Sequence, residues 1–241
     1  KPDPKPLQEK QFMPNPKDSR FSSQTICKIL LAAKLISKDQ ALGLLKKEAG
    51  AKHILFKQKI QKKGNAISHQ KPTALVSFID VLLYLKIQRA DQPLKRLDED
   101  KIYKTLAAAW KVPYKKIDPL KLELSLVTGT ISKSFAKKYL LLPLFIEEGK
   151  LIVATPDPFN FEAIQDVEMV SKLKVKPVVS AKSDIKKLIN ELYGFMYSIS
   201  AAEDLFSKQG FDIGNLEQFV NLKTLDDSSS NEQHIVNAVN H

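Results

Sequence analysis

The 241-residue chain is poor in the residues that build chemical sites. Its single cysteine, Cys27, excludes an intrachain disulfide and any metal site with several cysteines. Its eight glycines are scattered, and neither the phosphate-binding loop G-x-x-x-x-G-K-[ST] nor the dinucleotide fingerprint G-x-G-x-x-G occurs. The four histidines (His53, His69, His234 and His241) lie far apart and have no partners at metal-ligand spacing. We therefore expect no catalytic, metal or cofactor site in these residues.

The chain also lacks a long apolar run. Its most apolar window, Ala74–Ile87, is too short for a membrane-spanning helix and carries Asp80, so we expect a helix of the core. The start of the chain has no signal peptide. A hydrophobic content of 43% excludes global disorder. The chain begins at Lys1 and ends inside an apolar-periodic segment, so we expect a fragment of a longer protein.

Positive charge is concentrated in the front of the chain. The net charge is +11, and residues 1–100 carry 20 basic and 10 acidic residues, whereas residues 101–241 carry 18 and 17. Between residues 46 and 71 the only acid is Glu48. The candidate docking residues are the lysines of this stretch, Lys46, Lys47, Lys52, Lys57, Lys59, Lys62 and Lys63, with Lys71 at its end.

Two interpretations of this lysine patch remain open. A run of like charge is often only a solvated face. The same run fits a docking surface for an acidic protein or for anionic lipid near a membrane complex. Nucleic-acid binding would require interleaved aromatic residues or a recognised motif, and only Phe56 lies nearby, so we expect no nucleic-acid partner.

Composition and periodicity predict four segments. Residues 1–20 are rich in proline and are predicted to form a flexible lead-in. Residues 21–95 are predicted to form a small helical subdomain, and residues 98–194 an α/β subdomain. Residues 195–241 are predicted to be a linker followed by the start of a helix. The expected fold class is α+β: a small all-α subdomain, then an α/β subdomain with about three strands packed by helices.

Local signals predict the helical elements. Ser22 or Ser23 is expected to cap the first helix, and Ser37-x-x-Gln40 is a capping box for the second. Gly50 is expected to end that second helix. Asp98–Asp100 place acids at the start of a later helix, where the helix dipole favours them.

The stretch 140–194 predicts a compact α/β unit. Two apolar runs, Leu140–Ile146 and Leu151–Ala154, flank a short polar connection and indicate a hairpin. Val175–Val179 is predicted as a third strand. The helix between the hairpin and this strand is predicted to bury Phe161, Ile164, Val167, Val170 and Leu173. A last helix, with Ile185, Leu188, Ile189, Leu192 and Tyr193 on one face, is predicted to start after Ser183 and to stop at Gly194.

This stretch resembles a known family. Its marks are Leu142-Pro143-Leu144, Leu151–Pro158, Val175–Ala181, and Asp184-Ile185 followed by Tyr193-Gly194. Together they are similar to the N-terminal region of the type II secretion and type IV pilus assembly ATPases, over about residues 98–194. Leu106-Ala107 to Tyr114 resembles the family's L-A…G-L-P-Y, with Lys111 at the glycine position. Glu232–His241 is similar to the segment that enters the family's ATPase core.

The resemblance implies a non-catalytic part of a cytoplasmic ATPase, with no cofactor of its own. The core, with ATP and Mg²⁺, would follow residue 241. The helical subdomain would dock the motor, itself a homo-hexamer in this family, on the cytoplasmic domain of an inner-membrane platform protein. The fragment would then be peripheral to the inner face of that membrane, contact its own ATPase core, and relay motion for secretion or pilus assembly. The lysine patch is our candidate for the docking surface.

A second-messenger role is the alternative. In some relatives the first helix pair binds cyclic di-GMP through a pattern R-L-G-x-x-L-V-x-x-G-L-I-T…Q. Aligning Leu35-Ile36-Ser37 with the family's Leu-Ile-Thr places Thr25 at the arginine and Cys27 and Lys34 at the two glycines. Glu48 falls at the glutamine. The apolar scaffold is therefore kept, and the ligand-contacting residue types are not.

Overall fold

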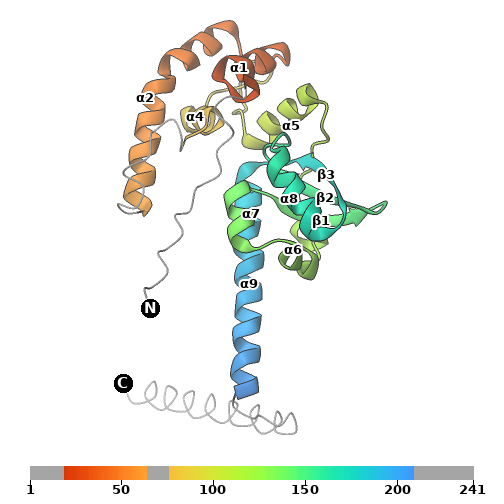
Figure 1. Cartoon of the computed structure of the whole chain (residues 1–241). Coiled ribbons are helices and arrows are strands. Elements are labelled where there is room, and N and C mark those ends of the chain that lie inside the picture. Colours follow the sequence, from red (N-terminus) through yellow and green to blue (C-terminus); the bar gives the residue numbers. More distant parts are fainter. Residues whose placement is uncertain (1–18, 64–75, 209–241) are drawn as a thin grey trace, which may run out of the picture. The chain divides into compact units, whose positions relative to one another are not determined.

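The computed structural model describes residues 19–63 and 76–208 of the chain, and the chain divides into two compact units, residues 1–194 and residues 195–241 (Figure 1). The helices are η1 (Ser19–Phe21), α1 (Ser23–Ala32), α2 (Lys38–Lys63), α4 (Phe78–Leu85), α5 (Glu99–Trp110), η3 (Pro119–Lys121), α6 (Leu124–Thr130), α7 (Lys133–Tyr139), α8 (Phe161–Ser171) and α9 (Lys182–Lys208). The strands are β1 (Leu142–Glu147), β2 (Lys150–Thr155) and β3 (Lys174–Val179). The predicted α+β class with a three-stranded sheet is confirmed. The predictions for the proline-rich lead-in and for the linker after residue 208 lie outside the described residues.

The caps of the first helices are where the sequence predicts them. The Ser22 hydroxyl accepts the backbone N–H of Thr25 and starts α1. In the capping box, the Gln40 side chain accepts the Ser37 N–H at 2.8 Å, and the Ser37 hydroxyl accepts the Gln40 N–H at 3.1 Å. Lys34 takes a left-handed conformation, φ 56°, and turns the chain between α1 and α2.

The prediction that Gly50 ends the second helix is wrong, because α2 continues to Lys63. A glycine stops a helix when it adopts a left-handed conformation, and Gly50 does not. The residues after it also favour continuation, since Ala51 and Phe56 are buried and extend the apolar face of α2.

The sheet has the order β1-β2-β3. β1 and β2 are antiparallel, with Glu147 opposite Lys150, and the tight turn between them uses Glu148 (φ 50°) and Gly149 (φ 72°). β3 runs parallel to β2, and α8 provides the crossover between them. The predicted hairpin and third strand are therefore confirmed.

The prediction for the buried face of α8 is wrong in part. Ala163, Ile164 and Val167 are buried. Of these three, Ile164 and Val167 belong to the face that the sequence predicts to be buried. Phe161 and Val170 were expected beside them, but they are 61% and 66% exposed. The buried stripe is narrower than the apolar pattern, so part of that pattern faces solvent.

α9 is a continuous helix through Gly194, so the predicted stop at this glycine is wrong. Ser183 lies inside the helix and is not its cap. Its backbone N–H donates to the Glu99 carboxylate at 3.3 Å. Glu99, on α5, thus accepts a hydrogen bond from one of the N–H groups in the first turn of α9, which have no partner within their own helix. The predicted face of α9 is otherwise correct, with Ile185, Leu188 and Ile189 buried.

The buried Tyr193 hydroxyl fastens α9 to the α6–α7 connection. It lies 2.6 Å from the Ile131 carbonyl and 3.0 Å from the Val127 carbonyl. Burial raises the pKa of Tyr193 to about 12, so the hydroxyl keeps the proton that it donates. This residue therefore holds the packing of the α/β part together.

Two clusters of buried side chains share the first unit. The first lies among α1, α2, α4 and α5 and also includes Val179 and Ala181, at the end of β3. The second surrounds the sheet. Backbone bonds join the two regions, because the Val179 N–H donates to the Pro113 carbonyl at 2.8 Å and the Lys115 N–H donates to the Val179 carbonyl at 2.9 Å. The helical and α/β parts are thus packed together, and the exact subdomain boundaries stay a prediction.

Candidate docking surface

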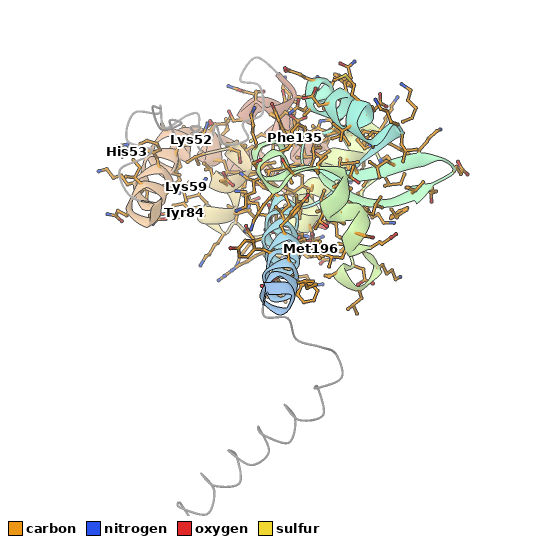
Figure 2. The ribbon with its side chains drawn as sticks, turned by 60° about the horizontal axis from the view of Figure 1, so that its bottom comes forward. Lys52, His53, Lys59, Tyr84, Phe135 and Met196 are labelled. Carbon is orange, nitrogen blue, oxygen red and sulfur yellow. The ribbon has the colours of Figure 1, made fainter. Side chains whose placement is uncertain are left out.

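The lysines of α2 fall into two groups. Lys46, Lys47 and Lys57 are exposed, and none of them forms an ion pair with a carboxylate that the structure describes. Lys52 and Lys59 are half-buried and paired: Lys52 lies 2.6 Å from Glu48, and Lys59 lies 3.3 Å from Asp80. Figure 2 shows Lys52 and Lys59 along α2, near Tyr84 of α4. The remaining members, Lys62 and Lys63, end α2, but their side chains are outside the described residues, as is Lys71.

This division follows from the helical spacing of the patch. Lys46 and Lys57 are eleven residues apart, close to three turns, so they lie on one side of α2. Lys52 and Lys59 are seven apart, two turns, and lie on another side, beside the face that packs on α4. The charge run seen in the sequence therefore contains an accessible set and a structural set.

Asp80 is the centre of the structural set. Its carboxylate accepts the Lys182 ammonium at 3.1 Å through both oxygens and the Lys59 ammonium at 3.3 Å. It also accepts the Ser77 N–H at 3.0 Å, and the Ser77 hydroxyl accepts the Asp80 N–H, which completes a capping box at the start of α4. One carboxylate thus joins α2, α4 and the first residue of α9.

The charges around Asp80 determine its ionisation. Burial by itself disfavours the carboxylate, but Lys182 and Lys59, with the bonds from Lys182 and from Ser77, outweigh it and hold the pKa of Asp80 well below its ordinary value. The Asp80 and Lys182 side chains are only 19% and 14% exposed. Solvent screening of this pair is therefore weak.

A sequence reading misses this cluster. Lys182 is 102 residues from Asp80, so no local pattern connects them. The one available signal was the spacing Ser77-x-x-Asp80, which is a capping pattern in front of an apolar run.

The residues that the structure describes hold little else that could support chemistry. No group of three or more His, Cys, Asp or Glu side chains among them could hold a metal ion. Within the same ranges, no helix is long and apolar enough to span a membrane. Cys27 is buried, and burial, with Glu48 nearby, raises the pKa of its thiol to about 11, so the thiol stays protonated and unreactive. Cys27 is therefore part of the packed core.

A second surface feature lies on α8. A shallow depression of about 400 Å³ is lined by Glu162, Gln165, Asp166, Glu168, Met169 and Lys174. Glu168 is engaged, because its carboxylate accepts the Val175 N–H at 2.9 Å and pairs with Lys174 at 3.3 Å. The outer side of α8 is therefore acidic and partly apolar, in a chain that is basic as a whole.

Comparison with solved structures gives several likenesses, two of which are described here, both with low TM-scores. The structure of MshE with cdg has a TM-score of 0.45 and 14% identity, and the match covers 70% of this chain and 98% of that one. The N-terminal domain of XpsE has a TM-score of 0.42 and 19% identity, covering 70% of this chain and 94% of that one. Both scores lie below 0.5, so these likenesses carry no functional argument.

The sequence relatives are more specific. Two of them are the type IV pilus assembly ATPases TfpB and PilB of Acinetobacter baylyi. Identity to TfpB is 22% over 146 residues, which are 60% of this chain and 25% of TfpB. Identity to PilB is 34% over 61 residues, which are 25% of this chain and 10% of PilB. The matched parts thus span a quarter or less of these relatives.

The MshEN domain family matches residues 110–198, from the end of α5 into α9. This range contains the whole sheet and most of the motifs that carry the resemblance to the secretion and pilus ATPases. Residues 110–198 therefore match the MshEN domain, and the chain is homologous to the type IV pilus assembly ATPases over the parts that align.

Proposed function

We propose that this chain is the non-catalytic N-terminal region of a type II secretion or type IV pilus assembly ATPase. The observation that carries the proposal is the match to the MshEN domain at residues 110–198, together with the homology to TfpB and PilB. The ATPase core, with its ATP and Mg²⁺, lies outside these residues in the proposal. The parent protein works as a cytoplasmic homo-hexamer at the inner face of the inner membrane.

In this role the helical part anchors the motor to the cytoplasmic domain of an inner-membrane platform protein. The docking surface is the lysine patch, with Lys46, Lys47 and Lys57 as its accessible members. These lysines are exposed and form no ion pair with a carboxylate in residues 19–63 or 76–208, and such lysines attract an acidic surface and accelerate its association. Lys52 and Lys59 contribute less, because Glu48 and Asp80 already neutralise them.

The same proposal assigns a relay to α9. Its first residue, Lys182, is bound to Asp80, and its first turn is bound to Glu99 through Ser183. Because Ala181 packs in the core of the helical part, the start of α9 is fixed to that part on several sides. A displacement of α9 would then move the docking surface with it.

Charge reversal tests the docking. Lys47→Glu with Lys57→Glu should weaken binding to the platform protein's cytoplasmic domain by at least about tenfold at low salt, about 1.4 kcal/mol. The difference from the original chain should shrink at high salt, where surface charges are screened. Lys104→Glu, at an exposed lysine of α5, is the matched control and should leave the affinity unchanged. Equal affinities for all three chains at low salt would refute the docking surface.

Sensing of cyclic di-GMP is the rival function. Its support is the resemblance of the α1–α2 pair to a second-messenger subdomain. Against it, Cys27, at a position where the family pattern has glycine, is buried and thus withdrawn from any ligand. Calorimetric titration of the chain with cyclic di-GMP decides, since micromolar binding would favour the rival and no heat of binding would exclude it.

A further inference from the structure

The outer side of α8 carries apolar side chains that the fold does not bury. Phe161, Met169 and Val170 are 61%, 63% and 66% exposed. Next to them lie Glu162 and Asp166, which also line the 400 Å³ depression. Met169 and Val170 share one exposed side of α8 with Glu162 and Asp166, whereas Phe161 lies nine positions from Val170, on the opposite side of the helix. Exposed apolar groups bordered by charge are typical of an interaction site. We name Glu162, Asp166, Met169 and Val170 the α8 face.

The N-terminal half of α2 carries the opposite charge on a comparable surface. Leu42 is 59% exposed, and Lys46 follows it one turn later on the same side of the helix. Gly50 comes one turn further on, and nothing lies within 4 Å of the position where its Cβ would be. We name Leu42, Lys46 and Gly50 the α2 face. In Figure 1, α2 lies beside α1 and α4, whereas α8 lies over the sheet.

The two faces complement each other in charge, and each carries an exposed apolar side chain. Lys46 offers an ammonium for the carboxylates of Glu162 and Asp166 and an aliphatic stem that can cover Met169. Leu42 offers an apolar side chain for Met169 and Val170. Gly50 has open space around its Cβ position, which leaves room for a second helix to approach. Because both faces are exposed within one copy of the chain, neither is satisfied by the other in that copy.

We propose that the α2 face of one copy docks on the α8 face of a second copy. Such a contact joins two different surfaces, so it is heterologous, and repeated copies close into a ring when the rotation permits. The inference rests on the proposed function, because it supplies a contact between neighbouring subunits of the ring-shaped motor. It uses Lys46 of the proposed docking surface for the contact between copies, while Lys47 and Lys57 remain for the platform.

Charge reversal of each face gives a direct test in the 241-residue chain. Lys46→Glu disables the α2 face, and Glu162→Lys with Asp166→Lys disables the α8 face. Sedimentation velocity over a wide concentration range should show self-association of the original chain. Each variant alone should associate at least about tenfold more weakly, about 1.4 kcal/mol. The control Lys104→Glu should associate as the original chain does.

Mixing the two variants tests whether the α2 face of one copy contacts the α8 face of another. One variant keeps its α8 face and the other keeps its α2 face, and their two reversed faces also carry opposite charges, so an equimolar mixture should associate more strongly than either variant alone. Lys46→Glu and Asp166→Lys combined in one chain should recover part of the lost association. A chain that stays monomeric at all concentrations, or a mixture that associates no more strongly than either variant alone, overturns the proposal.

The docking assay distinguishes the two proposals. The α8 variant should bind the platform domain with unchanged affinity, since it leaves Lys47 and Lys57 intact. If self-association fails the test while Lys47 and Lys57 still matter for the platform, only the contact between copies is wrong. If the mixture associates more strongly than either variant while platform binding ignores those lysines, only the docking surface is wrong.

Discussion

Replacing Asp80 by Asn tests whether one carboxylate holds the helical part to α9. The change removes the charge and keeps an oxygen that can accept the Ser77 N–H, so the cap of α4 survives. It leaves Lys182, 14% exposed, without its anion. Removing one partner of a fully buried pair costs about 3–5 kcal/mol, and an exposed pair contributes at most about 1 kcal/mol. For this exposure, and with Lys59 36% exposed, we expect a loss of about 2–3 kcal/mol.

Urea unfolding followed by fluorescence measures this loss conveniently, because Trp110 is the chain's one tryptophan. Trp110 lies in the first unit, 5.1 Å from the Phe21 ring and 5.5 Å from the Phe159 ring, so it reports on tertiary packing there. Asp80→Asn should lower the midpoint clearly. Lys182→Met in the same background should add much less than it does alone, because the two residues interact. Glu191→Gln, at the exposed pair with Lys187, is the control and should leave the midpoint nearly unchanged.

The pH dependence has a definite sign. The pKa of Asp80 is lower in the folded chain than in the unfolded one, so its contribution to stability is present above the unfolded value, about 4. This contribution is lost as pH falls below that value towards the folded pKa. The difference in unfolding free energy between the original chain and Asp80→Asn should therefore shrink below about pH 4. A difference that is absent at neutral pH, or that does not change in acid, would refute the role of the ion pairs.

Three further changes test other parts of the fold. Tyr193→Phe removes the hydroxyl that donates to two buried carbonyls and should cost about 1–2 kcal/mol in urea unfolding, and an unchanged midpoint would contradict that bond. Gly194→Ala should stabilise α9 by about 0.5–1 kcal/mol, since no atom lies within 4 Å of the added Cβ, and a loss of stability would mean that α9 bends there. Gly149→Ala should destabilise the hairpin by about 1 kcal/mol because its φ is +72°, measured by the same unfolding assay.

Local sequence signals predicted much of this fold because the contacts concerned are local. The Ser37–Gln40 capping box and the turn at Glu148-Gly149 each depend on residues within four positions of one another. The failures at Gly50 and Gly194 have one cause. Glycine marks a helix end only where the chain turns into a left-handed conformation, and neither of these glycines takes one. In α2, Ala51 and Phe56 are buried beyond Gly50 and continue the packed face of the helix.

The sequence predicted which lysines make up the candidate docking surface, but it did not predict which of them form ion pairs in the folded chain. The lysines of α2 were visible in the sequence, but their division depends on where Glu48 and Asp80 lie in space. Lys52 pairs with Glu48 four positions away on the same helix, but Lys59 is held by Asp80, which also binds Lys182 from 102 positions away. Only tertiary structure could show which lysines remain accessible.

The wrong burial prediction for α8 bears on the proposed contact between copies of the chain. Periodicity predicted that Phe161 and Val170 are buried, and in this chain they are not. An apolar pattern records burial in the working state of a protein, including burial against other subunits, whereas the isolated chain shows only its own contacts. In the proposed contact, Met169 and Val170, which are exposed beside Glu162 and Asp166, would be covered by the α2 face of a second copy, and Phe161, on the opposite side of α8, would stay outside it.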